Sequence, residues 1–217
     1  MSEVKFDFSN TKDRKLYKIL TPLGKLLTKI VYNVKFEGVE NFPKEGGYIF
    51  ASNHVVAVDP VYISTRVPQP VHFMGKQEAF SKAFGRWFLT NFNSFPVNRG
   101  VGDRSAIDYA IKLINDGRVL GIFPEGTREK DRKLGRPKSG IALIAKETKA
   151  DILPVSIHFE DKPKFRAKVV VRYGKIIKYS DLGLENSEEK SSVALKSATR
   201  IVWERITELW EGSSFDY

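Results

Sequence analysis

Cysteine is absent from the 217-residue sequence. The chain therefore cannot form a disulfide, bind a metal through a thiolate or attack a substrate with a cysteine nucleophile. Histidine is scarce as well, since only three are present, and no two of them stand at the spacing of a metal-ligand pair. These absences predict an intracellular protein without a metal site.

An uninterrupted apolar run of about 20 residues, the length needed to span a bilayer, is also missing. The most apolar stretch, residues 16–34, is interrupted by Lys18, Pro22, Lys25 and Lys29. The first ten residues mix acidic, basic and polar side chains, unlike a secretory signal. We therefore expect the chain to stay in the cytoplasm and to cross no membrane.

Acidic residues are outnumbered, with 26 Asp and Glu against 36 Lys and Arg, so the formal net charge is +10. Such a chain is attracted to polyanions, which include nucleic acid, anionic membranes and phosphorylated substrates. Nucleic acid is disfavoured because its recognition usually places aromatic and basic side chains together on an exposed sheet face. The strands of this sequence are of the buried, apolar kind.

The N-terminal part of the chain, residues 15–34, has the pattern of an amphipathic helix. Lysines gather on one side and apolar residues occupy much of the remainder, namely Lys15, Lys18, Lys25 and Lys29 against Leu16, Ile19, Leu20, Leu23, Leu27, Ile30 and Val34. Such a helix either lies in the headgroup layer of a membrane or packs on the protein core. We set residues 1–34 apart as an amphipathic, membrane-associating segment, with a kink expected at Pro22.

The remainder, residues 35–217, alternates short apolar strands with helices. Strands are predicted over 48–51, 72–74, 95–97 and 119–123, and helices from 59 onward and over 77–91, 104–115 and 139–148. Two more strands, 152–159 and 168–173, precede a closing helix over 187–211, and the second of them is expected to be antiparallel at a sheet edge. This order predicts a single α/β domain with a mainly parallel mixed sheet flanked by helices.

His54 and Asp59 are the residues best suited to acid–base chemistry. Both follow the predicted strand at 48–51, and the carboxyl ends of parallel strands form the ligand-binding edge of such sheets. The five-residue separation allows the carboxylate to fold back onto one imidazole nitrogen, which leaves the other nitrogen as a proton acceptor. The alternative is structural, because Asp before Pro60 is typical of a helix N-cap.

Two loops carry an arginine within two residues of a glycine. In the first, Gly126 lets the backbone approach a ligand, Thr127 adds a hydroxyl, and Arg128 can bind phosphate through two N–H groups. In the second, Arg99 stands directly before Gly100 after the strand at 95–97. Read together, the two arginines are expected to converge on one phosphate, whereas each alone is typical of a solvated surface residue. A basic stretch over 130–138 is either a flap over the substrate or a solvated loop.

Four segments together resemble the motifs of the glycerolipid acyltransferase family. They are Asn-His-x4-Asp at 53–59, Phe-Pro-Val-Asn-Arg-Gly at 95–100, Phe-Pro-Glu-Gly-Thr-Arg at 123–128 and Ile-Leu-Pro-Val at 152–155. Their order and spacing agree with the family, and Lys138-Ser139-Gly140 is similar to its basic segment after the third motif. One departure is that the four residues between His54 and Asp59 are all apolar, where family members often carry Ser or Gln.

The resemblance implies a function and a role for each motif. A fatty acyl group would pass from an acyl thioester to the free hydroxyl of 1-acyl-glycerol-3-phosphate, giving phosphatidic acid in phospholipid biosynthesis. His54 would deprotonate the acceptor and Asp59 would orient His54. The acceptor phosphate would be held by Arg99, Glu125, Gly126, Thr127 and Arg128, and Pro154 would shape the acyl-donor side.

The resemblance also implies direct attack without an acyl-enzyme, no cofactor, and coenzyme A or acyl-carrier protein as the donor. It places the protein peripherally on the cytoplasmic side of the cell membrane, against an anionic surface, with a lysophospholipid as acceptor and no nucleic-acid partner. Two alternatives remain. One is an acyltransferase acting on another lysophospholipid or hydroxylated lipid, and the other is a non-catalytic basic module that binds membrane or nucleic acid.

Overall fold

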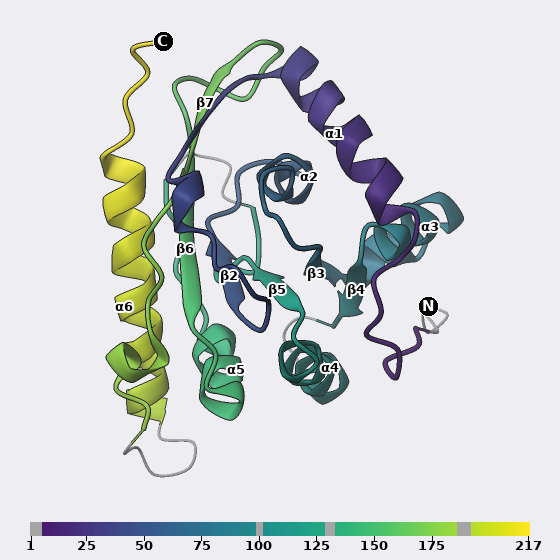
Figure 1. The fold of residues 1–217 in the computed structure, drawn as a ribbon, viewed down its shortest axis with the longest axis vertical. Coiled ribbons are helices and arrows are strands. Elements are labelled where there is room, and N and C mark those ends of the chain that lie inside the picture. Colours follow the sequence, from purple (N-terminus) through teal and green to yellow (C-terminus); the bar gives the residue numbers. More distant parts are fainter. Residues whose placement is uncertain (1–5, 99–101, 129–132, 186–191) are drawn as a thin grey trace.

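The computed structural model describes residues 6–98, 102–128, 133–185 and 192–217 of the chain. Its strands form one sheet in the order β1-β7-β6-β2-β5-β3-β4 (Figure 1). They are β1 (Asn33–Glu37), β2 (Ile49–Ser52), β3 (Val71–Lys76), β4 (Ser94–Val97), β5 (Val119–Ile122), β6 (Ile152–Phe159) and β7 (Lys168–Tyr173). Neighbouring strands are parallel except β6 and β7, so the predicted single α/β domain with a mainly parallel mixed sheet is confirmed.

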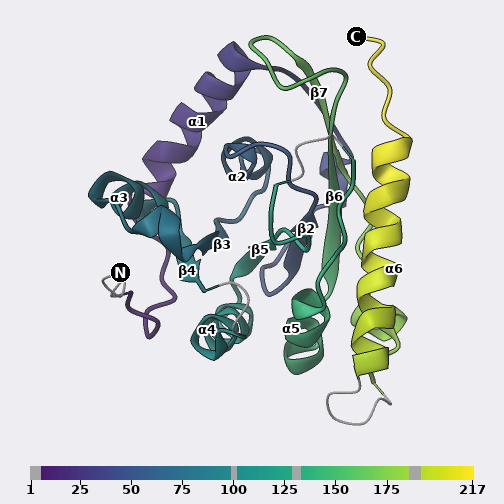
Figure 2. The same ribbon diagram turned by 180° about the vertical axis from the view of Figure 1, so that it is seen from behind.

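Helices cover both faces of this sheet (Figures 1 and 2). They are α1 (Tyr17–Val31), α2 (Asp59–Ser64), α3 (Ala83–Asn91), α4 (Arg104–Asn115), α5 (Gly140–Thr148) and α6 (Ser192–Glu211). Alternation along β2 shows the two layers, because Ile49 and Ala51 pack with α4, α5 and α6, whereas Phe50 packs with α1 and α2. The central strands β2 and β5 are buried along their whole length and consist almost entirely of apolar residues, because both of their faces are covered.

The predicted edge position of the strand at 168–173 is wrong, although its antiparallel pairing with β6 is confirmed. β1, which we did not predict, pairs in parallel with β7 and forms the edge instead. Every residue of β1 is only partly buried, so its sequence lacks the apolar run of the inner strands. The boundary that we placed after residue 34 falls inside this strand.

The predicted helix over 77–91 is interrupted. A 3₁₀ turn covers Gln77–Phe80, Lys82 has an extended backbone, and α3 begins at Ala83. Phe80 is fully buried while α3 has no buried residue, so the chain must change direction between them. The closing helix α6 begins at Ser192, and the cap that we predicted at Ser187 lies outside the described residues.

The predicted N-terminal helix is present as α1, which continues through Pro22. It packs against α2 and buries Tyr17 and Gly24, yet a row of large apolar side chains on its outer surface stays exposed: Ile19, Leu23, Leu26, Leu27 and Ile30. Within the ranges that the structure describes, no helix is both long and apolar enough to span a bilayer.

Candidate active site

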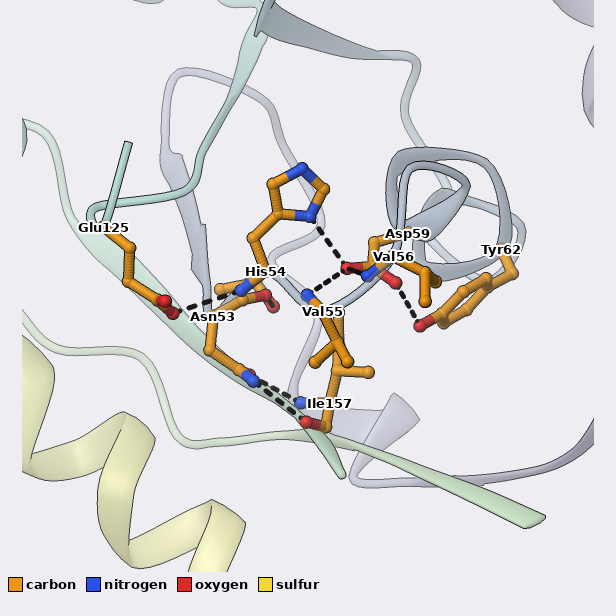
Figure 3. Close-up of polar contacts among 9 residues, drawn as sticks. Asn53, His54, Val55, Val56, Asp59, Tyr62, Glu125 and Ile157 are labelled. Atoms are coloured by element: carbon orange, nitrogen blue, oxygen red, sulfur yellow. Dashed lines mark hydrogen bonds and ion pairs between the residues drawn. The ribbon is translucent and has the colours of Figure 1, made fainter. Parts of the chain in front are cut away.

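The loop after β2 is anchored to the neighbouring strand by Asn53. Its buried side chain donates from Nδ2 to the carbonyl oxygen of Ile157 at 2.9 Å and accepts at Oδ1 from the N–H of the same residue at 2.7 Å (Figure 3). A side-chain amide is the group that can satisfy both backbone atoms at once. Asn53 therefore fixes the start of the loop that carries His54.

Asp59 is fully buried and accepts four hydrogen bonds. At Oδ2 the donors are the backbone N–H groups of Val55 at 2.6 Å and Val56 at 2.9 Å together with His54 Nδ1 at 2.8 Å, and at Oδ1 the donor is the Tyr62 hydroxyl at 2.5 Å (Figure 3). A buried charge is stable only when it is satisfied in this way. The carboxylate thus organises the whole loop between itself and the histidine.

The alternative role of Asp59 as a helix N-cap is wrong. Asp59 is the first residue of α2, Val58 occupies the cap position, and Pro60 follows in the first turn. The carboxylate turns back to the preceding loop instead of bonding to the N–H groups of its own helix. The sequence Asp-Pro indicated the start of the helix correctly, but not where the side chain points.

Tyr62 is a site residue that our reading of the sequence missed. It is fully buried, and burial first, then the negative charge of Asp59, raises the pKa of its hydroxyl well above the ordinary value. The hydroxyl therefore stays protonated and donates to the carboxylate. The sequence signal is the three-residue spacing from Asp59, which places both side chains on one face of α2.

The imidazole of His54 is oriented by three contacts. Its ring stacks on Phe123 with a centroid separation of 4.1 Å and an interplanar angle of 19°, and its backbone N–H donates to Glu125 Oε1 at 3.2 Å. Because Nδ1 donates to Asp59, Nε2 is left as the acceptor, and in the described part of the chain it forms no hydrogen bond. Such a histidine can take a proton from a bound hydroxyl.

The loop after β5 lies beside His54 because β2 and β5 are neighbouring parallel strands. Within it Glu125 is buried, whereas Thr127 and Arg128 are exposed. Gly126 has a φ of +71°, and a Cβ at this position would lie 3.1 Å from Lys138 Nζ. The left-handed backbone favours glycine here, and a Cβ would also require the end of the Lys138 side chain to shift by a few tenths of an ångström.

Lys138 is the last residue of the basic stretch that we expected to be either a flap over the substrate or a solvated loop. Its backbone N–H donates to the carbonyl oxygen of Pro124 at 2.9 Å, which holds the lysine over the loop. A cavity of about 210 Å³ is lined by Lys138 and Gly126 and also by Val97 and Asn98. The second and third motifs thus share one cavity, although Arg99 itself lies outside the described residues.

Pro154 is not brought to this cavity. It is buried in β6 opposite Ala51, its carbonyl oxygen accepts from the N–H of Gly174 at 2.8 Å, and it lines a hollow together with residues of α6. A separate apolar cavity of about 360 Å³ lies between α1, α2 and α3, and it is lined by Val58 and Val61 of the loop and helix that carry Asp59. Of the four apolar residues between His54 and Asp59, Val58 is the one that lines this cavity.

Comparison with known proteins gives three findings. Residues 33–158 match the family model described as Acyltransferase. The chain is 30% identical over 199 residues to the 1-acyl-sn-glycerol-3-phosphate acyltransferase of Bacillus subtilis, covering 89% of this chain and 96% of that protein. It is 31% identical over 194 residues to the protein of the same name from Streptococcus pneumoniae, covering 86% and 72% respectively.

A solved structure is similar as well. The crystal structure of the 1-acyl-sn-glycerophosphate acyltransferase from Thermotoga maritima superposes with a TM-score of 0.69 and 25% sequence identity. The match covers 92% of this chain and 81% of the other.

Proposed function

The chain belongs to the acyltransferase family, and on that premise we propose that it transfers a fatty acyl group from an acyl thioester to the free hydroxyl of 1-acyl-glycerol-3-phosphate. The product would be phosphatidic acid, formed in phospholipid biosynthesis. The observation that carries the proposal is the 2.8 Å bond between His54 Nδ1 and the buried carboxylate of Asp59. The names of the bacterial relatives support the choice of acceptor.

In this reaction His54 Nε2 accepts the proton of the acceptor hydroxyl while the hydroxyl oxygen attacks the carbonyl carbon of the thioester. The carbon–sulfur bond then breaks, and the proton passes from His54 to the leaving thiolate, so that an ester and a free thiol are formed. Asp59 stabilises the imidazolium between these steps. A base positioned in this way typically contributes about 10² to 10⁴ in rate.

The acceptor's phosphate would lie at the cavity between the second and third motifs. Lys138 and Gly126 line this cavity, and Thr127 and Arg128 follow Gly126 in the same loop. Arg99 directly follows Asn98 in the sequence, and in this proposal it adds a second guanidinium for the phosphate. Glu125 has another role in this proposal, because a carboxylate repels a phosphate and its Oε1 accepts from the backbone of His54. We assign it to positioning the histidine.

The acyl donor would be coenzyme A or acyl-carrier protein thioester, with no cofactor. The apolar cavity between α1, α2 and α3 is suited to a hydrocarbon chain, and its wall at Val58 directly precedes Asp59. Pro154 lies on the opposite face of the sheet, so its effect on the donor side would pass through β6, whose Ile157 holds Asn53.

We further propose that α1 attaches the protein peripherally to the anionic cytoplasmic surface of the membrane. Leu23 and Leu27, both about half exposed, stand beside lysines on this helix. Leu23→Gln/Leu27→Gln should reduce sedimentation with anionic liposomes, whereas Val193→Gln, at an exposed position of α6, should not. Equal sedimentation of all three proteins would remove α1 from the proposal. Deleting residues 1–34 would be less informative because it also removes part of β1.

The test of the reaction is incubation of purified protein with liposomes, radiolabelled 1-acyl-glycerol-3-phosphate and each donor in turn, followed by thin-layer chromatography. Wild type should form phosphatidic acid, and His54→Ala should form none while keeping its circular-dichroism spectrum. Product from both proteins would refute the role of His54. Activity with other lysophospholipids but not with this acceptor would favour the alternative acceptors.

A further inference from the structure

A basic hollow of about 330 Å³ lies where the C-terminal half of α1, the start of β1, the end of α2 and the β6–β7 turn meet. Lys25 and Lys29 of α1, Arg66 after α2 and Arg166 of the turn line it. No acidic side chain is among its described lining residues. It shares no residue with the cavity at the second and third motifs.

The four cations have no counter-ion within the described ranges of the chain. Cations on the adjoining strand β7 do, since Lys168 pairs with Glu160 and Arg172 with Glu37. Four like charges around one hollow repel one another, and this repulsion is relieved when an anion enters. All four side chains are exposed, and together they give the hollow a concentrated positive charge that an anion would neutralise.

The two arginines are held in place by their own contacts. The Arg66 guanidinium lies 4.7 Å from the ring centre of Phe36. Arg166 has a left-handed backbone, its N–H donates to the carbonyl oxygen of Val31 at 2.6 Å, and its guanidinium donates to that of Lys29 at 3.0 Å. Each guanidinium has five N–H donors, so both keep donors for a bidentate contact with a phosphate.

The surroundings indicate how the anion would arrive. Thr28 and Tyr32 form a wall that the basic hollow shares with the apolar cavity between α1, α2 and α3. Exposed apolar side chains flank the hollow on the same elements, Ile30 on α1 and Phe165 beside Arg166. An anion that belongs to a lipid would meet the cations while its chains meet these apolar groups.

We propose that the basic hollow binds the phosphate of an anionic membrane phospholipid, at a site separate from that of the acceptor's phosphate. The proposal rests on the membrane association proposed above. A hollow of about 330 Å³ fits a single headgroup, whereas an acidic carrier protein would need a broader surface.

The test uses dihexanoylphosphatidylglycerol below its micellar concentration, titrated calorimetrically into the full chain, because a dissolved monomer has no membrane surface potential. Lys29→Gln/Arg66→Gln should weaken binding by about tenfold or more, since two charge-assisted contacts are removed. The matched control Lys18→Gln/Lys162→Gln removes one charge from α1 and one from the β6–β7 turn outside the hollow, and it should change affinity by less than about twofold. Inorganic phosphate and dihexanoylphosphatidylcholine are titrated in parallel.

Equal weakening in the two double variants would overturn the proposal, because only general charge attraction would remain. If inorganic phosphate bound as tightly as the lipid and was lost in the same variant, the site would be one for free phosphate and the lipid source would be refuted. Unchanged lipid binding with a raised KM for acyl-carrier-protein thioester would assign the hollow to that acidic protein instead.

A replacement variant and a turnover assay separate loss of the headgroup site from misfolding and from loss of the reaction. If Lys29→Gln/Arg66→Gln does not fold, Lys25→Gln/Lys29→Gln takes its place, because it changes only exposed positions of α1. This variant should also lose binding of dihexanoylphosphatidylglycerol. Turnover of water-soluble, short-chain donor and acceptor should persist in every variant. Absence of that turnover in the wild type would count against the proposed reaction. Equal affinity of the two double variants for dihexanoylphosphatidylglycerol would count against the headgroup site alone.

Discussion

Tyr62→Phe tests whether the buried hydroxyl on α2 positions the catalytic pair. In the structure the hydroxyl is the donor to Asp59 Oδ1, while three other donors hold Oδ2. Phenylalanine keeps the ring and its packing but leaves Oδ1 buried without that donor. His54 would still be bonded to Oδ2, although the carboxylate could then rotate.

The loss of this hydrogen bond in Tyr62→Phe should affect both the stability of the protein and the rate of the reaction. A hydrogen bond to a charged group contributes about 1.5 to 3 kcal/mol, and its loss should lower Tm by about 3 to 12 °C in a chain of this length. Because Oδ2 keeps its donors, only part of this energy should reach the transition state. We expect kcat to fall by about 3- to 30-fold, which corresponds to about 0.6 to 2 kcal/mol.

The matched control is Tyr173→Phe, which removes another buried hydroxyl bonded to α2. That hydroxyl donates at 2.7 Å to the neutral carbonyl oxygen of Ile63. Its loss should cost about 0.5 to 1.5 kcal/mol of unfolding free energy and leave kcat within about twofold of wild type. The assays are phosphatidic acid formation and thermal unfolding followed by circular dichroism. Equal kcat values for Tyr62→Phe and Tyr173→Phe would refute the positioning role.

Two further predictions concern the loop after β5 and the N-terminal segment. Gly126→Ala should raise KM for the acceptor by about tenfold, with a smaller change in kcat. The reason is that a φ of +71° is unfavourable for alanine and that the new Cβ would displace the end of the Lys138 side chain. Steady-state kinetics with an unchanged KM would contradict this. Burial alone would raise the pKa of Asp13, but the hydrogen bond from His72 and the charge of Arg118, each at 2.9 Å, lower it overall. The ionised carboxylate therefore stabilises the fold at neutral pH, and this contribution is lost as the pH falls below the ordinary pKa of 3.8. Asp13→Asn should therefore lower Tm at pH 7 by about 2 to 8 °C. The difference from wild type should shrink as the pH is lowered below 3.8, and a difference that stays constant in acid would contradict this account.

Where local pattern and packing agree, the sequence predicted the elements closely. α4 covers the predicted residues 104–115 because Asp103 accepts from the N–H of Ala106 as a cap, and because apolar residues at helical spacing meet the core. The strands at 152–159 and 168–173 were likewise found at their predicted positions. The prediction of one continuous helix over 77–91 was wrong because the burial of Phe80, not helix propensity, decides the path of the chain there.

The sequence by itself determined the alternating α/β order and the candidate pair His54 and Asp59, because both depend on short spacings along the chain. The contacts of that pair with Tyr62 and Glu125, the position of Lys138 over Gly126, and the face on which Pro154 lies were decided by the tertiary structure. The same holds for β1, which becomes a strand only by pairing with β7.

The basic hollow is a site that the sequence alone did not indicate and that the tertiary structure forms. Lys29, Arg66 and Arg166 are far apart in the sequence, and each by itself has the pattern of an ordinary surface cation. They meet because α1 ends against the β6–β7 turn, where Arg166 donates to the carbonyl oxygens of Val31 and Lys29, and because α2 packs on α1. Periodicity records which face of an element is buried, but only the packing of elements against one another decides which exposed charges become neighbours.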